Sequence, residues 1–208
     1  MKKIVLSLIV THAVIVVCYG MDIESFIQPN NFELHPKKID ALKEVATSDC
    51  LEDSLTAHAL LCADYINKDS SKNLYSNVIY HAGIVLKENK PSWQSIYVQL
   101  TLLVLHSTGY MPDYNGQVKR ANELKDRLNT YEWDDIKNPI FTHLTSSDQF
   151  TKKKIMNMVD YFLVQAYCNL SQVKNAQGIY DKMTDNQMRN NASNLIKSHE
   201  IKIEKLER

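Results

Sequence analysis

Apolar residues recur every three or four positions along most of the chain after residue 36. In the segment 37–46, for example, Ile39, Leu42 and Val45 share one stripe. This spacing is typical of an amphipathic helix. Segments with the same period follow at 51–66, 74–86, 93–104, 118–128, 155–166, 173–180 and 188–206. We therefore expect an all-α fold of about seven antiparallel helices in one domain, 37–208, packed as stacked helical hairpins or as an irregular bundle.

One of these segments is apolar on every side. The run from Leu100 to Leu105 is interrupted only by Thr101. Since we find no partner strand of matching pattern, we expect a central buried helix there. Turn residues break the helical pattern at 109–116, and a second irregular stretch covers 133–148. Residues 21–36 form a polar, irregular lead-in.

The first twenty residues have the order of a secretory signal peptide. Lys2 and Lys3 precede an apolar stretch from Ile4 to Val17, and Gly20 is a small residue suited to the cleavage position. The apolar stretch is shorter than the roughly 20 residues of a typical membrane span. We expect a secreted protein that begins near Met21 and has no membrane contact after cleavage. An uncleaved anchor is the alternative.

Composition excludes several classes of function. The chain has 208 residues, 44% of them hydrophobic, with 24 Lys+Arg and 24 Asp+Glu. A formal net charge of zero gives no electrostatic support for nucleic-acid binding. No His-Glu-x-x-His, Cys-x-x-Cys, Gly-x-Ser-x-Gly, Walker-type or Gly-x-Gly-x-x-Gly motif occurs. We expect no catalytic residues, no cofactor and no metal, and hence a protein that is not an enzyme.

Three cysteines remain once Cys18 leaves with the signal peptide. If one helix runs from Cys50 through Cys62, their separation along its axis is about 18 Å, beyond the reach of about 7 Å between the Cα atoms of a disulfide. Any internal bridge then involves Cys168, and Cys50–Cys168 is the preferred pair, because Cys62 lies on an apolar stripe. Three unpaired buried thiols are the alternative.

Two glycosylation acceptors and one aromatic turn are the remaining candidate sites. Asn169 and Asn191 each begin an Asn-x-Ser sequence, so either can carry a glycan in a eukaryotic secretory pathway. The break near residue 110 places apolar and aromatic groups in a short loop, where they can anchor a partner. Its candidate contact residues are Tyr110, Met111, Pro112 and Tyr114. The alternative is that these side chains fold back onto the helix ends.

Residues 161–183 resemble a tetratricopeptide-type helical hairpin. Leu163 and Tyr167 stand at packing positions of that family's first helix, and Ala176 and Tyr180 stand at the small and aromatic positions of its second. The chain departs from the pattern at Val164, at Ser171 in place of the turn glycine, and at Met188 in place of the closing proline. The resemblance implies stacked hairpins and a groove that binds peptides.

A second resemblance concerns secreted proteins. Cys62 with Tyr65, and Tyr167 with Cys168, are similar to pieces of the Cys-Tyr-Cys motifs of the bicycle proteins secreted by gall-forming aphids. This resemblance implies a salivary-type effector. We expect a secreted protein that acts by binding a host or partner protein. A lumenal or periplasmic tetratricopeptide-like adaptor and a secreted lipid or small-molecule carrier are the alternatives.

Overall fold

A computed structural model describes residues 36–67, 72–89, 93–111, 113–130, 136–137 and 149–206. The predicted signal peptide 1–20 and almost all of the lead-in 21–36 lie outside these ranges. Over the described residues the chain is built from helices, with one pair of two-residue strands. The predicted all-α fold is confirmed. Eight helices lie within the described residues, in line with the expected number of about seven.

Two compact units divide the chain, with a boundary between Leu100 and Thr101 inside α6. The single domain 37–208 therefore stays a prediction. The first unit holds α3 (Pro36–Ala46), α4 (Leu51–Asn67), α5 (Lys72–Glu88) and the start of α6 (Gln94–Thr108). The second holds the rest of α6, α7 (Tyr114–Thr130), β1 (Ile136–Lys137), β2 (Gln149–Phe150), α8 (Lys152–Asn169), α9 (Val173–Tyr180) and α10 (Asn186–Leu206).

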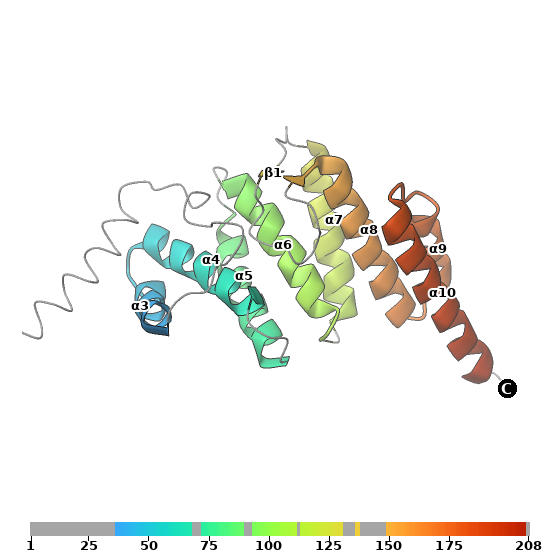
Figure 1. Cartoon of the computed structure of the whole chain (residues 1–208), viewed down its shortest axis with the longest axis horizontal. Helices are drawn as coiled ribbons and strands as arrows, with labels where there is room; N and C mark the ends of the chain where they lie inside the picture. Colours follow the sequence, from blue (N-terminus) through green and yellow to red (C-terminus); the bar gives the residue numbers. More distant parts are fainter. Residues whose placement is uncertain are drawn as a thin grey trace, which may run out of the picture. The chain divides into compact units, whose positions relative to one another are not determined.

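In the first unit, α4 packs against both α3 and α5 (Figure 1). Pro36 begins α3, a position that proline favours because its missing N–H is not needed in the first turn. The Ser54 hydroxyl of α4 donates to the Ala46 carbonyl at 2.7 Å and so ties the end of α3 to α4. Among the buried apolar side chains of α4 and α5, Leu55, Leu61, Cys62, Val78 and Ala82 are at most 1% exposed.

The apolar run of α6 is buried as predicted. Leu100, Leu102, Leu103 and Leu105 are 0% exposed, and Thr101 between them is 3% exposed. This burial explains why the helix shows no polar stripe along this stretch.

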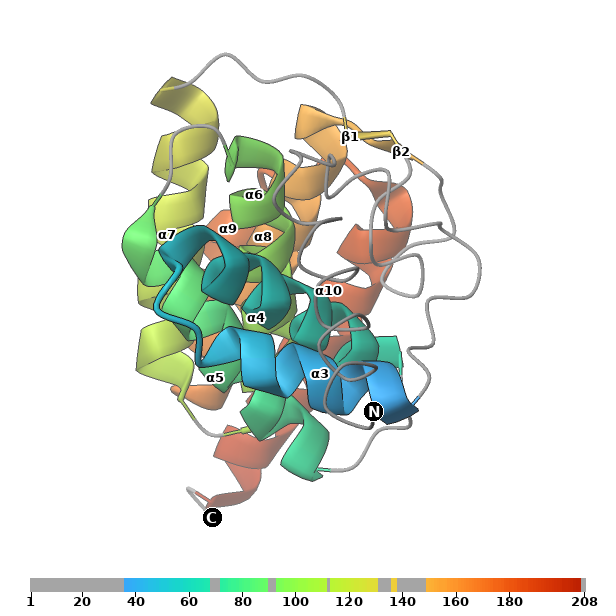
Figure 2. The same ribbon diagram turned by 90° about the vertical axis from the view of Figure 1, so that its left-hand side faces the viewer.

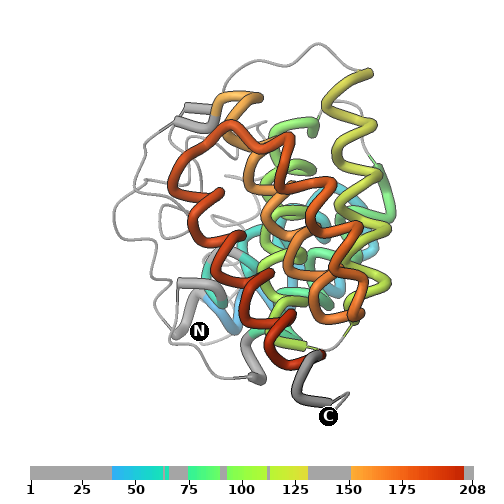
Figure 3. Tube along the Cα trace, turned by 90° about the vertical axis from the view of Figure 1, so that its right-hand side faces the viewer, coloured from blue at the N-terminus to red at the C-terminus, as the bar shows by residue number. Residues whose placement is uncertain are grey.

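In the second unit, α8 packs against α7, α9 and α10 (Figure 3). Val164, Cys168, Ala176, Met183, Ala192 and Ile196 form the core that α8, α9 and α10 share. The short strands β1 and β2 pair antiparallel, with Ile136 opposite Phe150 (Figure 2). Because each strand has only two residues, the described part of this unit remains mainly helical.

The turn between α8 and α9 has the hydrogen bonds of a Schellman motif. The Ser171 N–H donates to the Cys168 carbonyl at 2.9 Å, and the Gln172 N–H donates to the Tyr167 carbonyl at 2.8 Å. Ser171 has φ 57, in the left-handed region that favours glycine. The residue that replaces the turn glycine in the predicted hairpin thus takes a conformation that glycine adopts more easily.

Candidate recognition site

The predicted contact loop is the turn between α6 and α7. The Thr108 hydroxyl donates to the Val104 and Leu105 carbonyls at 2.8 and 3.0 Å, which closes the last turn of α6. The Tyr110 N–H then donates to the Ser107 carbonyl at 3.1 Å. The backbone therefore stays hydrogen-bonded up to the residue that we expect to contact a partner.

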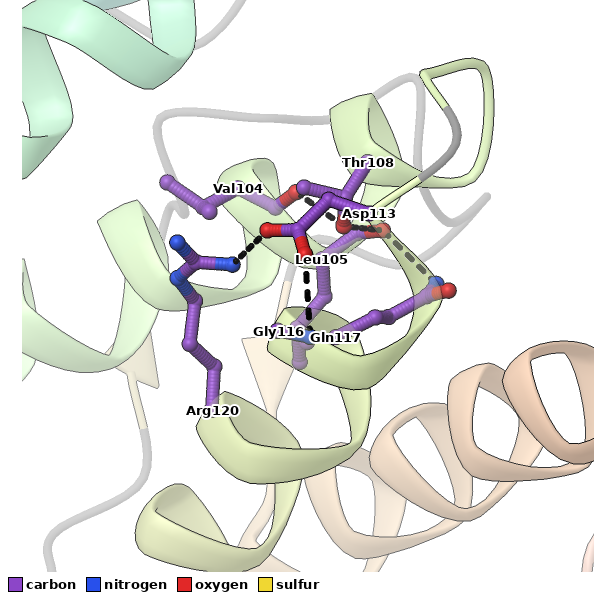
Figure 4. Close-up of polar contacts among 7 residues, drawn as sticks. All are labelled: Val104, Leu105, Thr108, Asp113, Gly116, Gln117 and Arg120. Atoms are coloured by element: carbon purple, nitrogen blue, oxygen red, sulfur yellow. Dashed lines mark hydrogen bonds and ion pairs between the residues drawn. The ribbon is translucent and has the colours of Figure 1, made fainter. Parts of the chain in front are cut away.

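Asp113 fixes the start of α7. Its Oδ1 accepts a hydrogen bond from the Gly116 N–H at 3.1 Å, which is the geometry of a helix N-cap (Figure 4). Its Oδ2 pairs at 3.0 Å with Nη1 of Arg120, which lies one helical turn beyond Gly116. One carboxylate thus caps the helix and binds a cation on it.

Gln117 anchors the turn from the inside. Its side chain is 0% exposed, and Nε2 donates to the Leu105 carbonyl of α6 at 3.0 Å and to Gln165 Oε1 of α8 at 3.3 Å. A Cβ at Gly109 would lie 2.8 Å from Gln165 Oε1, so a larger residue there would displace the end of this side chain. The turn is therefore held by α6, α7 and α8 together.

Four rings gather beside this turn, and we call them the aromatic patch: His106, Tyr110, Tyr161 and Phe162. His106 lies edge-on to Tyr110, with ring centroids 5.3 Å apart, and edge-on to Phe162 at 6.4 Å. Phe162 is buried, whereas Tyr110 is 57% exposed. Burial, and secondly the neighbouring Tyr110, raise the pKa of the Tyr161 phenol. The patch thus runs from a buried ring to an exposed one.

The four predicted contact residues separate in the structure. Tyr110 is exposed, as a contact residue must be, while Met111 is half-buried and Pro112 lies outside the described residues. Tyr114 is half-buried and begins α7. The predicted break of 109–116 is wrong at its end, because the cap at Asp113 makes residues 114–116 the first turn of a helix.

The structure does not show the predicted bridge between Cys50 and Cys168. Both are free thiols, as is Cys62. Cys168 is 0% exposed, and burial, followed by the nearby Glu200 carboxylate, raises its pKa to about 11. Few thiolates form at such a site, and the thiolate is the species that disulfide exchange needs. Cys50 directly precedes α4 and Cys62 lies within that helix, as the argument against a Cys50–Cys62 bridge requires.

The two predicted glycan acceptors occupy different environments. Asn169 ends α8, is half-buried, and donates from Nδ2 to the Gln165 carbonyl at 2.9 Å. Asn191 is exposed on α10. A glycan is attached to Nδ2, so this atom must be accessible. Asn191, whose side chain is exposed, meets this requirement better than Asn169 does.

Sequence reasoning missed two side-chain clusters. In the first unit, His58 of α4 and His81 of α5 bring their Nδ1 atoms to 2.6 Å. In the second unit, the buried Asn157 of α8 accepts hydrogen bonds from the Thr184 and Asp185 N–H groups at 2.8 and 3.0 Å. Each contact joins residues more than twenty positions apart, so no local spacing announces it.

The described residues hold neither a set of metal ligands nor a helix that could span a membrane. No three His, Cys, Asp or Glu side chains within these ranges come together as a set of metal ligands. Among the described helices, none combines the length and the apolar character that crossing a bilayer requires. No protein-family model, curated protein or solved structure matches the chain.

Proposed function

We propose that this is a secreted protein that acts by binding a partner protein, with Tyr110 at the turn between α6 and α7 as the central contact. The observation that carries the proposal is the 57% exposure of a tyrosine on a turn whose backbone is fixed. Tyrosine combines a large apolar face with a polar tip, and it is enriched among the residues that dominate binding energy.

The fixed geometry of the turn supports binding. Asp113 caps α7, and Gln117 joins α7 to α6 and α8. A contact residue held in place before binding loses less conformational entropy when a partner docks. His106 supports the Tyr110 ring from one side, which limits the rotamers it samples.

The test compares two exposed apolar residues of the same unit. Tyr110→Ser removes the proposed contact, and Ile201→Ser removes an apolar side chain of similar exposure, 53%, on α10. The wild-type chain and the two variants are each immobilised, and the amount of every protein that each captures is measured. The proteins captured by the wild-type chain are then ranked by how much the captured amount falls with each variant. We expect one partner to bind Tyr110→Ser about 30-fold more weakly, as for truncation of a binding hot spot worth about 2 kcal/mol, and Ile201→Ser equally well.

The melting temperature distinguishes a contact role from a structural one. An unchanged melting temperature with lost binding supports the proposal. Full binding by Tyr110→Ser, or an equal loss with Ile201→Ser, contradicts it.

Secretion has its own test, since protein recovered outside the producing cell should begin near Met21. An intact Met1 on that material contradicts a cleaved signal peptide.

A tetratricopeptide-like adaptor is the second candidate. Leu163 and Ala176, two of the residues that carry the resemblance, are 0% exposed on neighbouring helices α8 and α9. A small residue at the Ala176 position allows close approach of two antiparallel helices. Under this alternative a peptide binds along the helices of the hairpin, so Tyr110→Ser would leave its binding intact.

A further inference from the structure

The seam between α4 and α5 contains two polar contacts, one helical turn apart. His58 Nδ1 and His81 Nδ1 lie 2.6 Å apart, and the Cys62 thiol donates to the Val78 carbonyl at 3.6 Å. Cys62 and Val78 are 0% exposed, and His58 is 6% exposed. The histidine pair therefore holds together a seam that shields a thiol.

Two imidazole nitrogens at this distance share a single proton. In the neutral pair, one ring donates its Nδ1–H and the other accepts with the lone pair of its own Nδ1. A first added proton leaves this hydrogen bond in place. When both rings are imidazolium, both Nδ1 atoms carry hydrogen, no acceptor remains, and two positive charges face each other. The doubly protonated pair must separate.

The surroundings of the pair make its protonation harder. Tyr65 of α4 stacks on His81 with centroids 5.6 Å apart, and Tyr80 of α5 lies edge-on to both rings. Neither phenol offers a negative charge to an imidazolium. The charged group from α3 that acts on His81 is Lys43, which is itself positive.

We propose that the α4–α5 seam is an acid-sensitive latch, closed while at least one of His58 and His81 is neutral and opened when both are protonated. Opening separates α4 from α5 and exposes Cys62. The proposal concerns the first unit alone and is independent of the contact at Tyr110.

The pKa values of the two rings set the pH window. Burial, then the charges of His58 and Lys43, lower the pKa of His81 to about 4. Burial also lowers the pKa of His58, against an opposing hydrogen bond with the Ala46 backbone. A ring with a lowered pKa binds fewer protons when folded than when unfolded. The closed seam is therefore favoured above pH of about 6.5, and that advantage is lost as pH falls towards 4.

Thiol labelling of the full chain measures the opening. A dithiodipyridine, which reacts with thiols in acid, is applied between pH 7 and pH 4.5, and each labelled cysteine is read by peptide mass spectrometry. Each rate is divided by the rate of the same cysteine in the urea-unfolded chain at the same pH. We expect this ratio for Cys62 to rise by about ten- to a hundredfold, since each unit of pKa depression corresponds to a factor of ten. Cys168, buried in the second unit, is the internal reference, and its ratio should change much less.

A variant and a matched control assign the effect to the pair. His81→Gln keeps a neutral polar group opposite His58 and should flatten the pH dependence of Cys62 labelling. His199→Gln replaces a half-buried histidine on α10 of the second unit and should leave it unchanged. A wild-type ratio that stays constant down to pH 4.5 overturns the proposal, as does a full acid-induced rise in His81→Gln.

A surface variant decides the matter if His81→Gln already exposes Cys62 at pH 7. The Lys43 side chain is 54% exposed, so Lys43→Gln leaves the core intact. It removes a positive charge that lowers the pKa of His81 in the closed seam. The closed seam of this variant therefore tolerates protonation better, so acid favours the open form less, and the opening at pH 5 should fall about twofold at low salt. Opening equal to that of wild type at low salt overturns the latch in that case.

Discussion

In the second unit, uncharged amide side chains form hydrogen bonds between helices, whereas in the first unit two histidines join α4 to α5. Asn157 of α8 forms hydrogen bonds to the residues directly before α10, and Gln117 of α7 forms hydrogen bonds to α6 and α8. Amide side chains do not titrate, and imidazoles do so near neutral pH. Hydrogen bonds of similar length in the two units therefore differ in whether they depend on pH. Hydrogen bonds that do not change with pH suit the proposed contact turn, and the titrating pair of histidines suits the proposed latch.

Among substitutions in the second unit, we expect Asn157→Ala to reduce stability the most. Asn157 is 5% exposed, and its side chain also donates to the Lys153 carbonyl at 2.8 Å. Its loss leaves the Thr184 and Asp185 N–H groups without their acceptor and should lower the free energy of unfolding by about 3 kcal/mol.

Urea denaturation measures this loss, and Asn175→Ala is the control. Asn175 is exposed on α9 and its side chain donates to Gln172 Oε1 at 2.9 Å within the same turn, so we expect a change within about 0.5 kcal/mol. Equal losses in the two variants would show that Asn157 does not hold the start of α10.

Lys125→Ala should have a smaller effect. Lys125 Nζ of α7 lies 2.6 Å from Asp160 Oδ1 of α8, with side-chain exposures of 24% and 12%. Its removal leaves the mostly buried Asp160 carboxylate unpaired. We expect a loss of about 1–2 kcal/mol, between the values of exposed and fully buried ion pairs. Lys119→Ala, which breaks the exposed pair with Glu123 at 3.9 Å, should cost less than about 0.5 kcal/mol.

Asp113→Ala tests the fixed turn itself. Loss of the N-cap should cost about 1 kcal/mol and speed amide exchange at Gly116 and Gln117. The matched control is Asp126→Ala, because Asp126 is an exposed aspartate near the other end of α7. If exchange at Gly116 is unchanged in Asp113→Ala, the side chain does not hold the turn.

Ser171→Gly is the smallest change, and it has the opposite sign. Glycine adopts the φ of 57 at this position without the clash of a Cβ, so we expect about 0.5–1 kcal/mol of added stability. The same substitution inside α10, Ser198→Gly, should instead cost about 1 kcal/mol. Thermal unfolding of the two variants reads the signs directly, and a destabilising Ser171→Gly would contradict the turn geometry.

The helices could be predicted because their signals are local. Apolar spacing located α3, and the continuous run of Leu100–Leu105 identified a buried helix. Tyr110 was found as an exposed ring because it stands among turn residues. The assignment of Tyr114 to a loop was wrong, since turn residues mark a break but do not show that Asp113 caps a helix directly afterwards.

The clusters could not be predicted because they depend on how helices pair. His58 and His81 are 23 positions apart, and Asn157 and Thr184 are 27 apart. Periodicity places each residue on a face of its own helix, but the register between two helices decides which side chains meet. Each of these residues alone has the pattern of an ordinary helical position.

Amide hydrogen exchange at pH 7 and pH 5, corrected for the intrinsic rate at each pH, tests the contrast between the two units most directly. The fixed turn predicts unchanged protection at Gly116, at Gln117 and along α8. The histidine latch predicts protection along α4 and α5 that falls about tenfold or more at pH 5. Equal losses in both units, or unchanged protection in α4 and α5, would contradict it.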